Sequence, residues 1–140
     1  MTMTITLHSG QKYQQTIRAG NHSFIVDEPV SAGGDDAGPD PYDYLLASLA
    51  GCTAITLFMY ARRKGWALEE VEMSLGISRV HSDDCGHCQE ENTVVDEIER
   101  HITLRGDLSQ EQRERLAYIA TRCPLHKTLT SPTYIHDTVA

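Results

Sequence analysis

The longest weakly polar run in the chain, "YLLASLAGCTAITLFMYA" from Tyr44 to Ala61, limits the possible folds most. Asp40 can cap a helix, Pro41 suits its first position, and Gly65 can end it, which predicts one helix over residues 41–64. The run has the length of a short membrane span, but small and polar residues interrupt it and the rest of the chain is strongly polar. A buried core helix is therefore predicted.

Apolar residues occur on nearly every side of this predicted helix. A surface helix of a small domain usually shows one apolar stripe, whereas this one spreads its apolar side chains around the axis: Leu45, Leu46, Leu49, Ile55, Leu57, Phe58 and Met59. Such a helix needs cover on several sides. In a chain of 140 residues that cover is easiest to find in a partner subunit, so the pattern predicts a homodimer.

The remaining segments indicate an α+β fold. The chain length predicts one domain, residues 1–140. Alternating apolar residues or turn signals predict strands over residues 3–9, 12–19, 22–28, 69–82, 96–106 and 133–139. The strands over 69–82 and 96–106 form a predicted hairpin, in which Arg100 interrupts the apolar alternation. A capping-box pair, Ser109 and Gln112, predicts one later helix, and Pro124 starts a short last one. The predicted sheets are mainly antiparallel.

The charge balance argues against two classes of partner. The formal net charge of −8 repels nucleic acid and anionic membrane surfaces. The basic residues 62–64 lie where the predicted helix ends, and cations are favourable there. The first residues, "MTMTITLHSGQ", have neither a basic nor an apolar region typical of a secretory signal. We therefore expect a protein that binds neither nucleic acid nor membrane. Four cysteines in a chain with no visible export signal indicate redox or metal chemistry and predict the cytoplasm.

Cys52 lies in the middle of the apolar helix and has two interpretations. A cysteine there is often a small buried hydrophobic residue. As a nucleophile it would have to ionise, and since burial opposes ionisation a cation would have to reach the sulfur. The residues around it in the sequence leave both interpretations open.

Cys123 precedes Pro124 and so occupies a predicted helix N-cap. Free backbone N–H groups and the helix dipole favour negative charge there. Alternatively, "RCP" only ends the preceding helix. His126 could reach the same site. The spacing of Cys52 and Cys123 does not show whether they meet in the folded chain.

The loop of the predicted hairpin carries a third candidate site, "CGHC". Cys85 and Cys88, with His81 and His87, offer enough ligands for a tetrahedral zinc ion. Two free thiols at a hairpin tip are the simpler interpretation. A thioredoxin-like motif is excluded because no strand-to-helix context follows.

Three segments resemble the OsmC/Ohr family of osmotically inducible and organic hydroperoxide resistance proteins. They are "IRAGNHSFIVDEP", "GPDPYDYLLASLAGCTAITLFMYARRKGW" and "DEIERHITLRGDLSQEQRERLAYIATRCPLHKTL". The resemblance covers nearly the whole chain. It implies an OsmC-like fold in which antiparallel sheets wrap long central helices in an intertwined homodimer. It also implies a thiol peroxidase that requires no cofactor.

The resemblance assigns roles residue by residue. Cys52 is similar to the family's peroxidatic cysteine, Cys123 to its resolving cysteine, and Arg18 to the arginine that stabilises the thiolate. Cys52 would attack a hydroperoxide and become a sulfenic acid, and Cys123 would condense with it to a disulfide. An external dithiol, from a lipoyl or thioredoxin-like protein, would then restore both thiols.

The chain departs from the family pattern just before the helix. Better-known members have a glutamate where this chain has Tyr42, with Asp43 next to it. Glu28 is therefore the expected partner of Arg18. Tyr42, Leu49 and Phe58 are the expected walls of a pocket for organic hydroperoxides. The alternative function is a non-enzymatic protein on the same scaffold, which senses oxidants or binds zinc or a small molecule.

Overall fold

A computed structural model describes residues 4–9, 12–86, 88–89 and 91–140. The chain divides into two compact units, residues 1–47 and residues 48–140. The long helix α1 (Pro41–Lys64) begins in the first unit and continues through the second.

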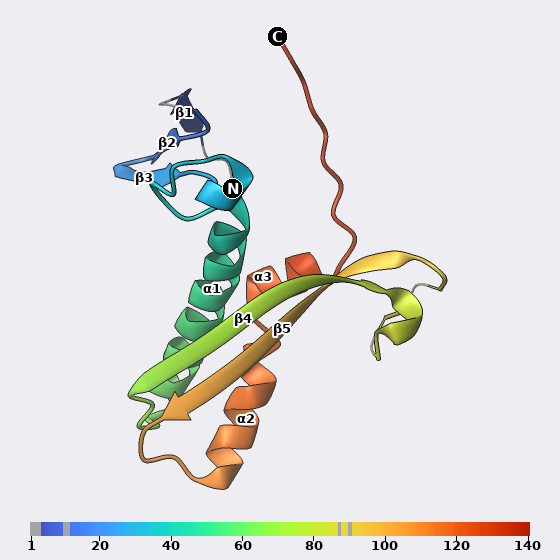
Figure 1. The fold of residues 1–140 in the computed structure, drawn as a ribbon. Helices are drawn as coiled ribbons and strands as arrows, with labels where there is room; N and C mark the ends of the chain where they lie inside the picture. The colour runs from blue at the N-terminus through green and yellow to red at the C-terminus, as the bar shows by residue number, and fades with distance from the viewer. Residues whose placement is uncertain (1–3, 10–11, 87, 90) are drawn as a thin grey trace. The chain divides into compact units, whose positions relative to one another are not determined.

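The first unit contains a three-stranded antiparallel sheet in the order β1-β2-β3 (Figure 1). The strands are β1 (Ile5–Ser9), β2 (Gln15–Ala19) and β3 (His22–Val26). Gly20 has φ of 59° in the tight turn between β2 and β3, a conformation that costs glycine little. All three predicted strands are present, although β2 begins at Gln15 instead of residue 12, β3 ends at Val26, and Met3 lies outside the described residues.

Asp27 holds together the loop that follows β3 and contains the 3₁₀ turn Val30–Ala32. Its side chain is 2% exposed, and its carboxylate accepts N–H groups from Glu28, Asp35 and Ala37 at 2.8, 3.2 and 3.1 Å. The hydrogen bond from Ala37 contributes most to lowering the pKa of Asp27, and burial acts in the opposite direction. Gly34 is required in this loop because a Cβ there would overlap the carbonyl oxygen of Glu28.

We predict that Asp27→Asn lowers the unfolding free energy at neutral pH, because an amide accepts these three N–H groups less well than a carboxylate. The folded-state pKa of Asp27 is lowered, so its stabilising contribution is complete above the ordinary carboxyl pKa. It is lost as the pH falls through the lowered value. Denaturant midpoints measured from neutral to acidic pH should therefore converge for the two proteins. A difference independent of pH would contradict this.

Helix α1 begins and ends where the sequence predicted. Asp40 Oδ1 accepts the N–H of Asp43 at 2.9 Å, and Asp43 Oδ2 accepts the N–H of Asp40 at 3.2 Å. These reciprocal bonds satisfy N–H groups that the helix itself leaves free. Gly65, with φ of 70°, follows the last residue. An 18-residue window of α1 has a mean hydropathy of 1.6, so the helix is long and apolar enough for a membrane span, a test that core helices of soluble proteins pass too.

The second unit packs α1 and two further helices against a long hairpin (Figure 1). Strands β4 (Glu70–His81) and β5 (Val94–Arg105) are antiparallel and pair along their whole length. Helices α2 (Gln110–Ala120) and α3 (Pro124–Leu129) follow. The core contains Leu57, Ala61, Leu108, Leu116, Ile119 and Ala120. The hairpin, the Ser109–Gln112 capping box and the Cys123 N-cap are confirmed.

The strand predicted over residues 133–139 is wrong. Residues 131–140 form neither helix nor strand, and all are exposed. Tyr134, Ile135 and Val139 have exposed fractions of 82%, 82% and 93%. A β-branched and aromatic segment becomes a strand only when a neighbouring edge pairs with its backbone, and no such edge contacts this segment within the described chain.

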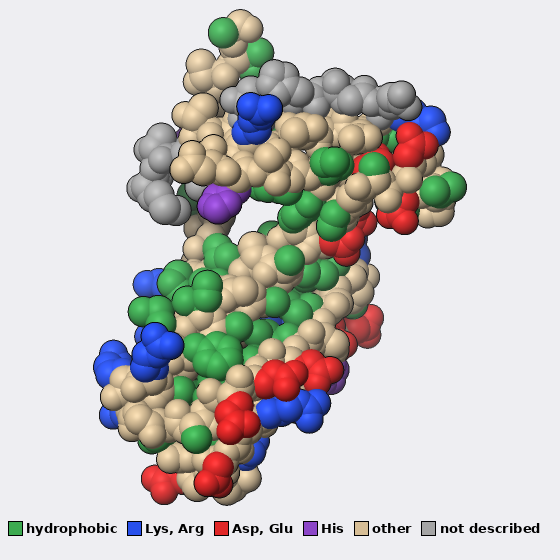
Figure 2. All heavy atoms as spheres, turned by 90° about the vertical axis from the view of Figure 1, so that its left-hand side faces the viewer, with side chains coloured by type: hydrophobic (Ala, Val, Ile, Leu, Met, Phe, Trp, Pro, Cys, Tyr) green, Lys and Arg blue, Asp and Glu red, His purple; other side chains and the backbone are tan. Residues whose placement is uncertain are grey.

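One face of α1 is covered in the second unit and the other is open. Leu49, Thr53, Leu57 and Ala61 form a buried stripe at a spacing of four residues. Apolar side chains also lie at the surface of the molecule (Figure 2). On α1 these are Ile55, Phe58 and Met59, which are 62%, 39% and 68% exposed. The helix is therefore apolar all round, as predicted, but the described residues of the second unit cover only part of it.

Candidate functional site

Cys123 is the centre of a polar cluster in the second unit. It is a free thiol with no exposed surface. As the N-cap of α3 it accepts the backbone N–H of His126 at 3.3 Å. Its Sγ also lies 3.4 Å from Oγ1 of Thr53, which comes from the buried stripe of α1. The chain therefore brings together residues 70 positions apart at one sulfur.

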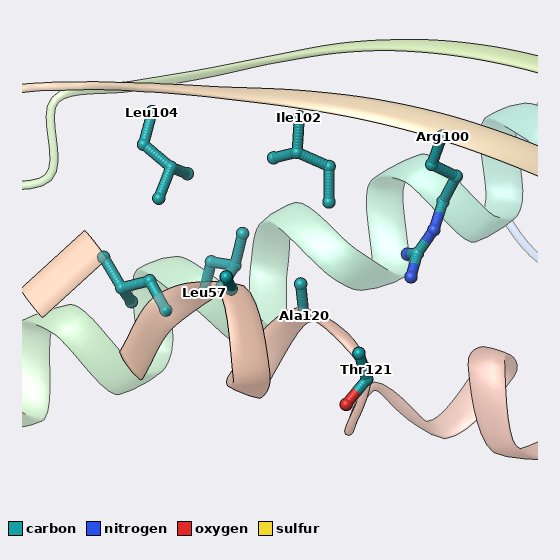
Figure 3. Close-up of a pocket in the computed structure, with 8 residues that line it drawn as sticks. Leu57, Arg100, Ile102, Leu104, Ala120 and Thr121 are labelled. Carbon is teal, nitrogen blue, oxygen red and sulfur yellow. The ribbon is translucent and has the colours of Figure 1, made fainter. Parts of the chain in front are cut away.

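Arg100 supplies the positive charge of this cluster. It lies on β5 at an inward-facing position of the hairpin, and its side chain points away from the strand toward the helices (Figure 3). Nη1 donates to Thr53 Oγ1 at 2.8 Å. Nη2 contacts His126 Nδ1 at 3.1 Å. One guanidinium thus joins α1 and α3, the two helices that contact Cys123.

The surroundings of His126 favour its neutral form. Burial, and then the positive charge of Arg100, lowers the pKa of His126, so the imidazole is neutral at neutral pH. A guanidinium can only donate, so Nδ1 must be the acceptor and the ring proton lies on Nε2. The cluster therefore contains one fixed positive charge, that of Arg100.

Arg100 lines two cavities. The first, of about 260 Å³, lies between β5, α1 and α2 and is otherwise mostly apolar, with Leu57, Ile102, Leu104, Leu116, Ala117, Ala120 and Thr121 in its walls (Figure 3). The second, of about 170 Å³, is lined by Leu49, Asp96, Ile98, Arg100, His126, Leu129 and Thr130. Of the three expected pocket residues, Leu49 thus lies beside the Cys123 cluster.

Cys52 lies next to Thr53 in α1 and is a free, half-buried thiol. Successive residues of a helix are about 100° apart, so Cys52 belongs to a different face, which it shares with Thr56 and Met59. Those two residues line a cavity of about 760 Å³ together with Tyr60, Arg62, Arg63, Ile119, Arg122 and Pro124. Among the described residues no hydrogen bond joins Cys52 to Cys123, so their pairing stays a prediction.

Of the other residues predicted for the peroxide site, three belong to the first unit, and Phe58 lies on α1 in the second. Arg18 is exposed on β2, Glu28 lies in the loop after β3, and Tyr42 is exposed in the first turn of α1; all three belong to the first unit. Within the described part of that unit no ion pair joins Arg18 to Glu28. Phe58 lines a separate cavity with Ala61, Arg62, Trp66 and Leu68. A common pocket for Tyr42, Leu49 and Phe58 stays a prediction.

The loop between β4 and β5 contains a disulfide. Cys85 and Cys88 are bonded to each other, and His81 Nδ1 accepts the N–H of Asp83. His87 lies outside the described residues. In this oxidised state the two sulfurs are not thiolate ligands, and the described residues contain no group of three or more metal-binding side chains. Zinc binding stays a prediction for the reduced loop.

Comparison with known proteins identifies the family. The family model described as "OsmC-like protein" matches residues 33–136, which is most of the chain and includes both free cysteines. The chain belongs to the OsmC-like protein family. Among curated proteins, none matches this chain in sequence.

Solved structures show the same OsmC-like α+β fold. An OsmC-like protein from Mycoplasma pneumoniae is similar, with a TM-score of 0.70, 23% identity and coverage of 92% of this chain and 87% of that one. The organic hydroperoxide resistance protein OhrB of Bacillus subtilis is similar with a TM-score of 0.61 and 20% identity, and the match covers 93% of this chain and 91% of that one. An organic hydroperoxide resistance protein OsmC from Legionella pneumophila is similar with a TM-score of 0.61 and 20% identity, and the match covers 93% of this chain and 90% of that one.

Thr53 and Arg100 are the residues of this OsmC-like site that sequence reasoning missed. Thr53 gave no signal, since a threonine in an apolar helix is unremarkable. Arg100 gave one: it interrupts the inward-facing series Ile98, Ile102 and Leu104 of β5. A charged residue on the covered face of a half-buried strand needs a buried partner, and here its partners are Thr53 and His126.

Proposed function

We propose that this OsmC-like protein is a thiol-dependent peroxidase that reduces organic hydroperoxides. The observation that carries the proposal is the presence of two free thiols around Thr53: Cys52 precedes it in α1, and the Cys123 sulfur contacts its hydroxyl. Membership of a family that includes organic hydroperoxide resistance proteins supports this chemistry. Cys52 is the more accessible of the two thiols and is the proposed attacking group.

The reaction needs no group other than the two cysteines and an external reductant. The Cys52 thiolate attacks one oxygen of the hydroperoxide, the O–O bond breaks, and the alkoxide leaves as an alcohol after protonation. Cys52 is then a sulfenic acid. The Cys123 thiolate attacks the Cys52 sulfur, the S–O bond breaks, and hydroxide leaves as water. A dithiol of the lipoyl or thioredoxin-like type reduces the resulting disulfide by exchange.

We further propose that the working form is a homodimer, in which Arg18 and Glu28 assist Cys52. The support is the open apolar face of α1, which includes Ile55 and Met59. Soluble proteins rarely leave several large apolar side chains exposed together on one helix. The cavity of about 760 Å³ on the Cys52 side of α1, lined by Met59 and three arginines, is a suitable place for an apolar peroxide.

The proposal predicts that Cys52→Ser abolishes peroxide consumption above background, because a hydroxyl cannot replace the thiolate as a nucleophile at neutral pH. Loss of an aromatic hydroperoxide, supplied with excess dithiol, would be followed for wild type and variant. The double variant Cys85→Ser/Cys88→Ser is the control, because it removes the disulfide outside the cluster without leaving a new free thiol, and it should keep the activity. Equal consumption by wild type and Cys52→Ser would contradict the peroxidase proposal.

The Cys85–Cys88 disulfide favours a second candidate function, redox sensing without turnover. A C-x-x-C pair that already forms a disulfide can change state with the surrounding thiol pool. Peptide mapping of peroxide-treated protein under non-reducing conditions distinguishes the two functions. A Cys52–Cys123 peptide supports the peroxidase, whereas oxidation confined to Cys85 and Cys88 supports the sensor.

A further inference from the structure

The hydroxyl of Thr53 has one hydrogen to donate and three hydrogen-bonding neighbours. Some of these neighbours can accept that hydrogen, and others can donate a hydrogen to the hydroxyl oxygen. It lies 2.8 Å from the carbonyl oxygen of Leu49, 2.8 Å from Nη1 of Arg100 and 3.4 Å from Sγ of Cys123. The guanidinium can only donate and the carbonyl can only accept. The hydroxyl therefore receives a hydrogen from Arg100, and while it gives its own to Leu49, a neutral Cys123 can donate its S–H hydrogen to Thr53.

Ionisation of Cys123 reverses the last of these bonds. A thiolate can only accept, so Thr53 must turn its hydrogen from Leu49 to the sulfur. The turn requires no movement of heavy atoms. It leaves the Leu49 carbonyl satisfied, because that oxygen also accepts the backbone N–H four residues later in α1. Thr53 can therefore bond the thiol and the thiolate, and the bond that it donates to the thiolate is charge-assisted and the stronger of the two.

We propose that Thr53 and Arg100 are the positioning residues that make Cys123 available as a thiolate: Thr53 donates to the sulfur, and Arg100 holds and polarises Thr53. Hydrogen bonds in such a chain strengthen one another, and a donor to the charged form favours ionisation. This goes beyond the peroxidase proposal, which gives roles to Cys52, Cys123, Arg18 and Glu28 only.

The charges around Cys123 agree with this role. From α1, the buried residues beside Thr53 are Leu49 and Leu57, which carry no charge. From α3, His126 is neutral and contacts the sulfur with its backbone N–H. From β5, Arg100 is the charge that faces the cluster, while Asp96 forms an exposed ion pair with Arg79 at 3.0 Å. Arg122, next to Cys123 in the chain, is exposed.

The functional consequence rests on the proposed peroxidase cycle, although the ionisation itself does not. The Cys123 thiol gives up its proton, which ends in the water released from Cys52, and the sulfur gains the lone pair that attacks the Cys52 sulfenic acid. The S–S bond then forms and hydroxide leaves from Cys52 as water. A cluster that ionises Cys123 would therefore hasten the step that protects Cys52 from further oxidation.

The test measures ionisation of Cys123 without any peroxide. In a Cys52→Ser background with the Cys85–Cys88 disulfide intact, Cys123 is the remaining thiol, and its thiolate absorbance can be titrated against pH. We expect Thr53→Val, which keeps the shape but removes the hydroxyl, to raise the titration midpoint by about one pH unit, the size typical of losing one hydrogen bond to the charged form. Arg100→Gln should raise it too.

Thr53→Ser is the matched control because it restores the hydroxyl, and its midpoint should return to that of the parent. Arg100→Lys should give an intermediate midpoint, since lysine keeps the charge but not the two-pronged geometry. If Arg100→Gln fails to fold, as judged by circular dichroism, the Thr53 pair decides alone. Equal midpoints for Thr53→Val and Thr53→Ser would overturn the proposal, whether or not the wild-type protein reduces peroxides.

Discussion

Replacing Cys123 with serine is expected to stop the peroxidase after about one turnover for each Cys52, because the sulfenic acid then lacks its internal partner. The variant should consume about one equivalent of hydroperoxide in a first phase. Continued exposure to peroxide should then convert Cys52 to the sulfinic acid, which thiols do not reduce. Serine is close in size to cysteine and can still accept the N–H of His126, so the N-cap of α3 should survive.

Two measurements check this result. Peroxide loss in the presence of a protein dithiol should show the single early phase for Cys123→Ser and sustained loss for wild type. Mass spectrometry of the Cys52 peptide should show two added oxygens in the variant. The double variant Cys85→Ser/Cys88→Ser, which removes the loop disulfide and leaves both Cys52 and Cys123, should behave as wild type. Sustained turnover by Cys123→Ser, with Cys52 not over-oxidised, would show that Cys123 is not the resolving cysteine.

The elements that the sequence predicted well are those whose signals are local. The start of α1 depends on Asp40 and Asp43, three residues apart, and the start of α2 on Ser109 and Gln112. These side chains form hydrogen bonds with backbone groups within one helical turn, so a short stretch of sequence is enough to predict where each helix starts. The β4–β5 hairpin was predictable for a similar reason, because alternation of apolar residues sets which face of a strand is covered.

The candidate site was less predictable because its contacts are distant in sequence. Thr53 and Cys123 are 70 positions apart, and Thr53 and Arg100 are 47 apart. No local sequence pattern predicts that Arg100 on β5 contacts Thr53 on α1. The final segment failed for a related reason: residues 133–139 have the composition of a strand, but a strand also needs an edge to pair with, and composition does not supply one.

The largest expected change in assembly comes from Ile55→Glu on the open face of α1. Ile55 is 62% exposed in the chain, so a glutamate there should leave the fold of the single chain intact. In the proposed dimer the same position is covered by the partner, and a buried unpaired charge costs several kcal/mol. We therefore expect the dimer to weaken by at least about a hundredfold in Kd, since each 1.4 kcal/mol is tenfold.

Light scattering across a range of concentrations measures this effect. Wild type should have about twice the chain mass of 15.6 kDa, and Ile55→Glu should approach the single-chain mass on dilution. Val94→Glu is the matched control, because Val94 is similarly exposed, at 57%, but lies at the start of β5. It should stay dimeric. A wild-type protein that is monomeric at every concentration, or an unaffected Ile55→Glu dimer, would mean that something other than a second copy covers this face of α1.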